Sequence, residues 1–192
     1  MTDTPTLPPA LGGESFDLAD AATGRLRVYA GVPPGAAAGA RPLLLVHSVN
    51  AAGSAREMRP LFDRYRAGRP VYALDLPGFG LSDRSDRMYT PRLMTDAVLA
   101  AAAEVQRRHG DAPLDLLAVS LGSEFAARAA GEQPGRFRSL ALVSPTGFNG
   151  TGRRMGATGS TRAVPGLHGV LAQRLWSGAL FRGLTRPGVI RF

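Results

Sequence analysis

The stretch LLAVSLG at residues 116–122 is an apolar run that stops at a serine placed between small residues. A buried strand that turns sharply into a helix has this pattern, and the turn lifts the hydroxyl of Ser120 above the edge of the sheet. Bulky side chains two positions before or after the serine would collide across the turn, and Ala118 and Gly122 avoid that collision. The stretch therefore predicts a strand, Ser120 as a candidate nucleophile, and a helix. The alternative is an ordinary strand-to-helix turn with a serine helix cap.

Four runs predict strands, of which the first two are continuously apolar and are expected to be buried on both faces, and helical patterns alternate with them. These two runs lie at 43–46 and 71–74, and two more strands are predicted at 114–118 and 140–143, after an alternating strand at 26–30. The helical patterns lie at 56–65, 90–108 and 121–130. Such alternation is typical of an α/β fold with a doubly wound, mostly parallel sheet, in which ligands bind at the carboxyl ends of the strands. Because His47, Asp75 and Ser120 each lie at or just after the end of a predicted strand, we expect them at one edge of the sheet.

The composition excludes several kinds of site. The chain has 192 residues, enough for one domain with a buried core, and it contains no cysteine and only three scattered histidines. Disulfides, thiolate metal sites and a cysteine nucleophile are therefore excluded, and we expect no metal ion and no cofactor. The sequence has neither a signal peptide pattern nor a run of about twenty apolar residues that would span a membrane, which predicts a cytoplasmic location.

The net charge of +8 is concentrated in the last third of the chain. All 23 basic residues are arginine, and residues 133–192 contain nine of them and no acidic residue. This part has no motif with base-reading geometry, so we expect no binding to nucleic acid. Three leucines at positions 167, 171 and 175 share one helix face with arginines between them. A helix of this kind packs as a lid over an active site, which we favour, or lies on an acidic lipid surface.

Three segments, in this order, resemble the α/β-hydrolase superfamily over about residues 24–148. LVHSVN at 45–50 is similar to the family's strand followed by a His-Gly oxyanion loop, and DLPGFGLSD at 75–83 is similar to its Asp-x-Pro-Gly-x-Gly-x-Ser turn. AVSLG at 118–122 takes the position of the nucleophile elbow. A tight Pro-Gly turn after a strand makes Asp75 a structural residue. A serine at the elbow disfavours the dehalogenase and epoxide-hydrolase branches, which use aspartate there.

The resemblance assigns roles to matching positions. Ser120 would attack a carbonyl carbon, and the backbone N–H groups of Leu121 and Val49 would stabilise the oxyanion that forms. Asn50 is a candidate for binding the substrate. The loop departs from the family at position 48, where serine replaces the usual glycine and the Val49 donor depends on the backbone angles there. His47 resembles the family's structural histidine, because the family's catalytic histidine follows the nucleophile along the chain.

The family's catalytic acid and histidine have no clear counterpart in this sequence. Both should follow the elbow, in the order serine, acid, histidine. The only carboxylates after Ser120 are Glu124 and Glu132, on the helix that leads away from the elbow. The only histidine after Ser120 is His168, which we interpret as a lid residue or a solvated polar group rather than the base, because no strand precedes it. We therefore expect this chain by itself to be inactive.

These observations divide the chain into an N-terminal segment at 1–23, an α/β-hydrolase core at 24–148 and the beginning of a helical cap or lid at 149–192. No strand pattern follows the run at 140–143, which would make that strand an uncovered edge of an incomplete sheet. We expect the 192 residues to be the N-terminal two-thirds of a longer hydrolase.

The sequence thus predicts serine-dependent hydrolysis of an ester or a similar acyl bond in a small molecule. Two alternatives remain open within the same fold. One is a cofactor-free haloperoxidase or a C–C bond hydrolase, which uses the same serine elbow. The other is a protein that has lost catalysis and keeps the cleft for binding a small molecule or a partner.

Overall fold

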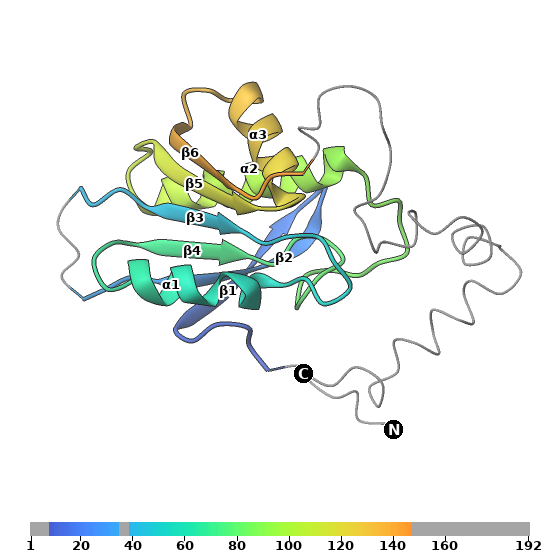
Figure 1. The fold of residues 1–192 in the computed structure, drawn as a ribbon, viewed down its shortest axis with the longest axis horizontal. Helices are drawn as coiled ribbons and strands as arrows, with labels where there is room; N and C mark the ends of the chain where they lie inside the picture. Colours follow the sequence, from blue (N-terminus) through green and yellow to red (C-terminus); the bar gives the residue numbers. More distant parts are fainter. Residues whose placement is uncertain (1–7, 35–38, 147–192) are drawn as a thin grey trace, which may run out of the picture. The chain divides into compact units, whose positions relative to one another are not determined.

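Six strands form one mixed sheet in the order β1-β2-β4-β3-β5-β6 in the computed structural model, which describes residues 8–34 and 39–146 (Figure 1). The strands are β1 (Glu14–Asp20), β2 (Gly24–Gly31), β3 (Leu43–Val46), β4 (Val71–Leu74), β5 (Leu114–Val119) and β6 (Phe137–Val143). Strand β3 pairs in parallel with β4 and β5, and β5 pairs in parallel with β6. The antiparallel pairs are β1 with β2 and β2 with β4. The predicted α/β fold with a mostly parallel sheet is confirmed.

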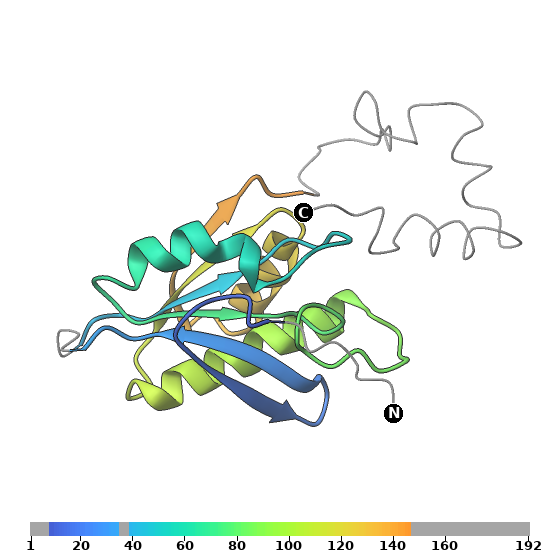
Figure 2. The same ribbon diagram turned by 90° about the horizontal axis from the view of Figure 1, so that it is seen from below.

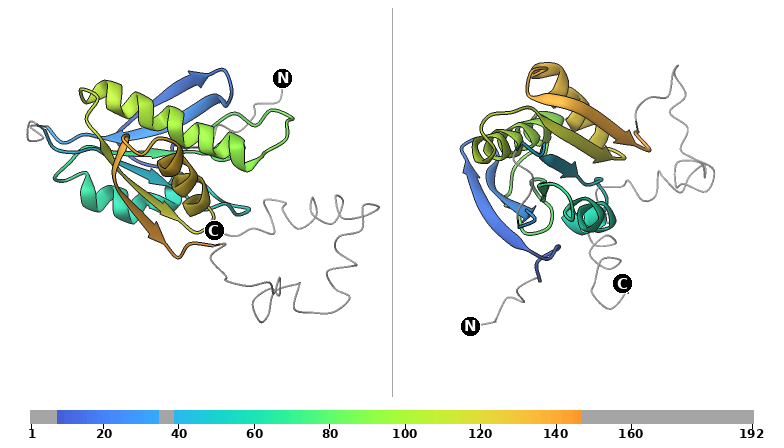
Figure 3. Two further views of the ribbon diagram at one scale, coloured as in Figure 1. Left: turned by 90° about the horizontal axis from the view of Figure 1, so that it is seen from above. Right: turned by 90° about the vertical axis from the view of Figure 1, so that its left-hand side faces the viewer.

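Three helices in the described part of the chain cover the two faces of the sheet. They are α1 (Arg59–Tyr65), α2 (Pro91–Arg108) and α3 (Gly122–Glu132), and a 3-10 turn, η1 (Ala55–Met58), precedes α1. Figure 2 shows the sheet between α1 and α2, and Figure 3 shows α2 and α3 together on the same face. The single helix predicted at 56–65 is divided because Pro60 lies in the first turn of α1, where its missing N–H breaks the hydrogen-bond pattern. The helix predicted at 90–108 begins one residue later, and Thr90 caps it through a hydrogen bond from Leu93 N–H.

Each face of the sheet has its own apolar core. Leu44, Val46 and Leu116 point toward α2 and α3, where Val98 and Phe125 pack against them. The alternate residues point the other way: Leu43, Leu45 and Leu117 pack with Met58 and Phe62 of η1 and α1. Burial on both faces explains why β3 and β4 are continuous apolar runs in the sequence, and why β5 is apolar apart from Asp115. It also fixes the register of the strands, because a shift by one residue would exchange the two faces.

Strand β1 was not predicted, although it forms a hairpin with β2 over seven paired positions from Glu14–Ala30 to Asp20–Gly24. The Asp20 carboxylate closes the hairpin by accepting hydrogen bonds from the N–H groups of Ala22 and Thr23. The strand escaped the sequence pattern because its apolar side chains, Phe16 and Leu18, are only half-buried. The part of the N-terminal segment from Glu14 onward therefore belongs to the sheet.

Strand β6 pairs only with β5 within the described residues, so it is an edge strand there, as the sequence indicated. Two of its apolar side chains are exposed, Leu140 by 38% and Val143 by 43%. The cap predicted at 149–192 lies outside the described residues. None of the helices in the described part of the chain is long and apolar enough to cross a membrane.

Candidate functional site

Ser120 occupies a sharp turn between the end of β5 and the start of α3. Its φ of +53° lies in the left-handed region, which costs a residue with a side chain about 1–3 kcal/mol. The turn is held on both sides: Ser120 N–H donates to the carbonyl of Val143 at 2.9 Å, and Ser123 N–H donates to the carbonyl of Ser120 at 3.1 Å. Ser120 is half-buried, and its hydroxyl makes no hydrogen bond to any other described residue. The predicted strand, serine and helix are therefore present, with strain at the serine.

Gly122 brings the turn against the loop that follows β3. A Cβ atom at position 122 would overlap the carbonyl oxygen of His47, a backbone atom that no rotamer change can move. The small residue required two positions after the serine is thus explained by this close approach. Ala118, two positions before it, is fully buried in β5 and its methyl group is accommodated in the core.

His47 has both ring nitrogens bonded to the backbone. Its Nδ1 lies 2.6 Å from the carbonyl oxygen of Ser48, and its Nε2 lies 3.0 Å from the backbone nitrogen of Leu76. The second bond requires Nε2 to accept, so the neutral ring carries its proton on Nδ1 and donates it to Ser48. Burial lowers the pKa of His47, which also favours this neutral form. Neither nitrogen is available to take a proton from Ser120, in agreement with a structural role.

The Ser48–Val49 peptide is oriented by His47. The carbonyl of Ser48 and the N–H of Val49 belong to one planar, trans peptide group, so they point in opposite directions. When the carbonyl accepts from His47, the Val49 N–H must point away from that ring. Val49 and Leu121 both line the cavity described below, and neither backbone N–H donates a hydrogen bond within residues 8–34 and 39–146. These are the two groups that the sequence predicts as oxyanion donors.

Ser48 needs no glycine-like backbone, because its φ is not in the left-handed region. Its side chain instead takes part in a hydrogen-bond network with Glu57 and Asn50. Glu57 accepts from Ser48 N–H at 2.7 Å and from Ser48 Oγ at 2.9 Å, and Asn50 Nδ2 donates to Ser48 Oγ at 2.7 Å. Asn50 is exposed and is not among the residues that line the cavity. The sequence analysis did not predict a role for Glu57 in this loop.

Asp75 is a buried junction of the loop after β4. Its Oδ1 accepts from Ala55 N–H at 2.7 Å, and its Oδ2 accepts from Leu81 N–H at 2.9 Å and from the Tyr29 hydroxyl at 3.1 Å. Burial, together with the charge of Asp75, raises the pKa of Tyr29 to about 12, so the phenol stays protonated and donates. A Cβ atom at Gly80 would overlap the Asp75 carboxyl group, which explains the glycine. The geometry agrees with the structural role inferred from the sequence.

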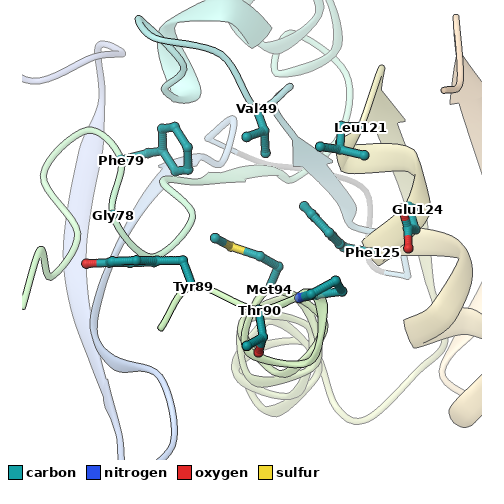
Figure 4. A pocket seen from close by; sticks show the side chains of 10 residues that line it. Val49, Gly78, Phe79, Tyr89, Thr90, Met94, Leu121, Glu124 and Phe125 are labelled. Atoms are coloured by element: carbon teal, nitrogen blue, oxygen red, sulfur yellow. The ribbon is translucent and has the colours of Figure 1, made fainter. Parts of the chain in front are cut away.

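A cavity of about 410 Å³ opens beside the turn (Figure 4). Most of its wall is apolar, with Met94 and Phe125 extending from α2 and α3 toward Val49 and Phe79 in the loops. The full lining is Val49, Gly78, Phe79, Tyr89, Thr90, Pro91, Met94, Leu121, Glu124 and Phe125. Such a space accommodates an apolar group of a small molecule beside Ser120.

Glu124 lines this cavity, which corrects the expectation that it leads away from the site. The reason is that α3 begins directly at the turn, so its first turn of helix forms part of the wall. The Glu124 carboxylate is paired with Arg128 at 2.8 Å, and that of Glu132 is paired with Arg92 at 2.6 Å. His168 lies outside the described residues. Among the residues that are described, no three His, Asp or Glu side chains are grouped to bind a metal ion.

Comparison with known proteins agrees with this geometry. Residues 41–160 match the profile of a family described as alpha/beta hydrolase fold. The similar solved structures include a bacterial membrane phospholipase A, which is 25% identical with a TM-score of 0.59. They also include the N-formylmaleamic acid deformylase of Pseudomonas putida, 23% identical with a TM-score of 0.60. A third is the thioesterase domain of the curacin biosynthetic pathway, 21% identical with a TM-score of 0.53.

These alignments cover most of this chain but only part of each similar structure. The alignment with the phospholipase covers 70% of this chain and 40% of the phospholipase. The alignment with the deformylase covers 88% of this chain and 56% of the deformylase. The alignment with the thioesterase domain covers 69% of this chain and 46% of that domain. The chain therefore spans about half the length of the structures that it resembles. A search among curated proteins gave no match.

Proposed function

The chain belongs to the α/β-hydrolase family, and we propose that it carries the serine nucleophile of an enzyme that hydrolyses an ester or a similar acyl bond. The observation that carries this proposal is the left-handed backbone of Ser120, with a φ of +53°, at the carboxyl end of β5 and beside an apolar cavity. Strain of this kind persists only where the surrounding structure holds it, and it is concentrated at functional sites. The family relationship supports the role of nucleophile at this position.

The reaction proceeds by attack of Ser120 Oγ on the acyl carbon. A C–O bond forms while an electron pair of the carbonyl moves to its oxygen, and the alcohol then leaves with a proton. Water hydrolyses the acyl-serine by the same steps. The N–H groups of Leu121 and Val49 donate to the oxyanion, and each such donor contributes about 3 kcal/mol. Leu121 also lies at the N-terminus of α3, where the helix dipole adds positive potential.

The serine proton requires a base, and the described residues hold none in contact with Ser120. His47 is bonded at both nitrogens, and Glu124 and Glu132 are both paired with arginines. After Ser120 the sequence has no carboxylate other than Glu124 and Glu132, and its one histidine, His168, lies outside the described residues. We therefore propose that the orienting acid and the base are supplied from outside the described residues. The activity belongs to the whole protein, of which this chain supplies the nucleophile, the oxyanion donors and one wall of the cavity.

The cavity favours an apolar acyl group over a charged one. Its wall is formed mainly by Val49, Phe79, Met94, Leu121 and Phe125, and its one acidic side chain is that of Glu124, which is paired with Arg128. An anionic acyl group would be repelled by that carboxylate. The similar structures include a phospholipase, a deformylase and a thioesterase, which supports an acyl bond as the target.

A fluorophosphonate probe tests the nucleophile directly, because it forms a covalent bond with an activated serine. Labelling should map to Ser120 and be abolished by Ser120→Ala. Ser144 is the matched control: it also follows a strand, and its φ of +46° is also in the left-handed region. Ser144→Ala should label normally. Labelling of neither this chain nor a C-terminally extended form would refute the proposal and favour a binding protein without catalysis.

A further inference from the structure

Glu57 is hydrogen-bonded to Ser48 of the oxyanion loop, and nothing in the hydrolytic mechanism requires it. It lies in η1, nine residues after Ser48, and both of its oxygens bond to that one residue. Oε2 accepts from the Ser48 backbone N–H at 2.7 Å, and Oε1 accepts from the Ser48 hydroxyl at 2.9 Å. It forms no ion pair within the described residues. The carboxylate is thus used for hydrogen bonding and is not neutralised there.

The electrostatic effect of Glu57 is opposite to what an oxyanion site needs. A negative charge close to a developing oxyanion raises the energy of the transition state. The role of the Glu57 side chain is therefore to hold Ser48 in position, and its charge does not contribute to that role. Ser48 is only 4% exposed, so without Glu57 its N–H and hydroxyl would have little access to water as a replacement partner.

Two consecutive peptide groups are held at Ser48. The Glu57 carboxylate fixes the His47–Ser48 peptide by accepting a hydrogen bond from the Ser48 N–H. The His47 ring fixes the Ser48–Val49 peptide by donating a hydrogen bond to the Ser48 carbonyl. Because each peptide group is planar, two fixed planes determine both backbone dihedrals of Ser48. The direction of the Val49 N–H then follows. A glycine at position 48 would lack the hydroxyl contact and leave the loop with more conformational freedom.

We propose that Glu57 is a positioning residue, which sets the direction of the Val49 N–H by holding Ser48 at its backbone and its hydroxyl together. Asn50 bonds the same hydroxyl, since its Nδ2 donates to Ser48 Oγ while its Oδ1 accepts from Ala52 N–H at 2.9 Å. The inference rests on the proposed function for its catalytic consequence, although the loop geometry is measurable without catalysis.

Three variants of the chain, or of its C-terminally extended form, test this inference. Glu57→Ala removes both acceptors. Glu57→Gln keeps one acceptor for Ser48 N–H and offers an amide N–H to Ser48 Oγ, so it should restore the loop. Arg56→Ala is the matched control, because it changes the neighbouring exposed side chain of the same turn. All three should unfold cooperatively.

The first readout is the rate of fluorophosphonate labelling at Ser120. Losing one oxyanion donor lowers rates about 100-fold to 1000-fold, and a donor left present but misdirected should lower them at least about 10-fold. Glu57→Ala should reduce the maximal labelling rate with little change in probe affinity. Glu57→Gln and Arg56→Ala should stay within about threefold of the unsubstituted chain. Normal labelling of Glu57→Ala would overturn the inference and leave the proposed function intact.

The second readout is backbone hydrogen exchange over residues 47–53, which needs no catalytic activity. Glu57→Ala should accelerate exchange in this segment, while Glu57→Gln and Arg56→Ala should not. Equal exchange in Glu57→Ala and Arg56→Ala overturns the inference whatever the labelling shows. If the unsubstituted chain and its extended form do not label at all, the proposed function fails, and the exchange experiment still decides whether Glu57 holds the loop.

Discussion

Replacing Gly122 by alanine tests whether the serine turn lies against the loop after β3. Gly122 is the first residue of α3, and a Cβ atom there would overlap the carbonyl oxygen of His47. Gly131 lies in the last turn of the same helix, and a Cβ atom there would have no neighbour within 4 Å. The two positions therefore share a helix and a residue type, and they differ in the space around them.

The expected energies follow from that difference. An alanine in place of glycine stabilises a helix by up to about 1 kcal/mol, and Gly131→Ala should gain most of this. At Gly122 the same gain is opposed by overpacking, which costs about 1–3 kcal/mol. The opposing atom belongs to the backbone of His47, so the cost should lie near the upper end of that range. The two variants should then differ by about 1–3 kcal/mol.

Thermal unfolding measures this difference. For a chain of this size, 1 kcal/mol corresponds to a change in Tm of about 2–4 °C. Gly131→Ala should raise the Tm, and Gly122→Ala should lower it relative to Gly131→Ala by several degrees. Gly122→Ala should also slow labelling at Ser120, since relief of the overlap displaces the turn or the oxyanion loop. Equal stabilisation by both substitutions would refute the close approach of the two segments.

Four further results are expected. Asp75→Asn should lower the free energy of unfolding in urea by about 3 kcal/mol, because an amide cannot accept all three hydrogen bonds made to the carboxylate; a loss below about 1 kcal/mol would contradict its role. The free energy of unfolding should decrease as the pH is lowered below 6.5, and His47 should contribute a slope of up to about 1.4 kcal/mol per pH unit. The reason is that burial lowers the pKa of His47 in the folded chain, so the unfolded chain binds a proton at a higher pH than the folded chain does. His109, whose pKa is also lowered by burial, adds a slope of the same sign, so His109→Gln should retain part of the dependence; a flat profile in that variant would count against a buried neutral His47. Glu124→Gln should improve reaction with anionic acyl esters about twofold to fivefold in the extended enzyme and leave neutral esters unchanged, as competition kinetics would reveal. Leu140→Lys should increase the soluble monomeric fraction in size-exclusion chromatography, since it places a charge on β6, an edge strand of the sheet within the described residues, and an unchanged monomeric fraction would show that this edge is not an associating surface.

The parts of the fold that the sequence predicts accurately are those buried on both faces. The runs at 43–46 and 71–74 became β3 and β4 with the predicted bounds, because continuous burial leaves an unbroken apolar pattern. β1 lacks that pattern, since it lies at the edge of the sheet and its stability comes from pairing with β2. The periodicity of apolar residues carries no information about such pairing between strands, which explains why β1 was not predicted.

The candidate site divides in the same way. Ser120 was predictable because the sharp turn from strand to helix leaves a local pattern of an apolar run, a serine and small flanking residues. Gly122 was predictable as part of that pattern, although the space it leaves is filled by the carbonyl of His47 on another loop. Glu57 was not predictable, because its partner Ser48 lies on another loop. A local signal was present but indicated a different partner: Ser54 and Glu57 have the spacing of a capping box, in which the carboxylate turns back to the cap residue. In the structure Ser54 caps η1 while the Glu57 carboxylate extends to Ser48.

The register of the sheet explains why two separate loops supply donors to one cavity. The parallel pairing of β3 with β5 places Val46 opposite Ala118. Val49 and Leu121 each lie three residues beyond this pair, at the same edge of the sheet, and both line the cavity. A register shift of one residue would separate them and would also exchange the buried faces of β5. The two apolar cores that specify strand pairing therefore also determine where the proposed oxyanion donors meet.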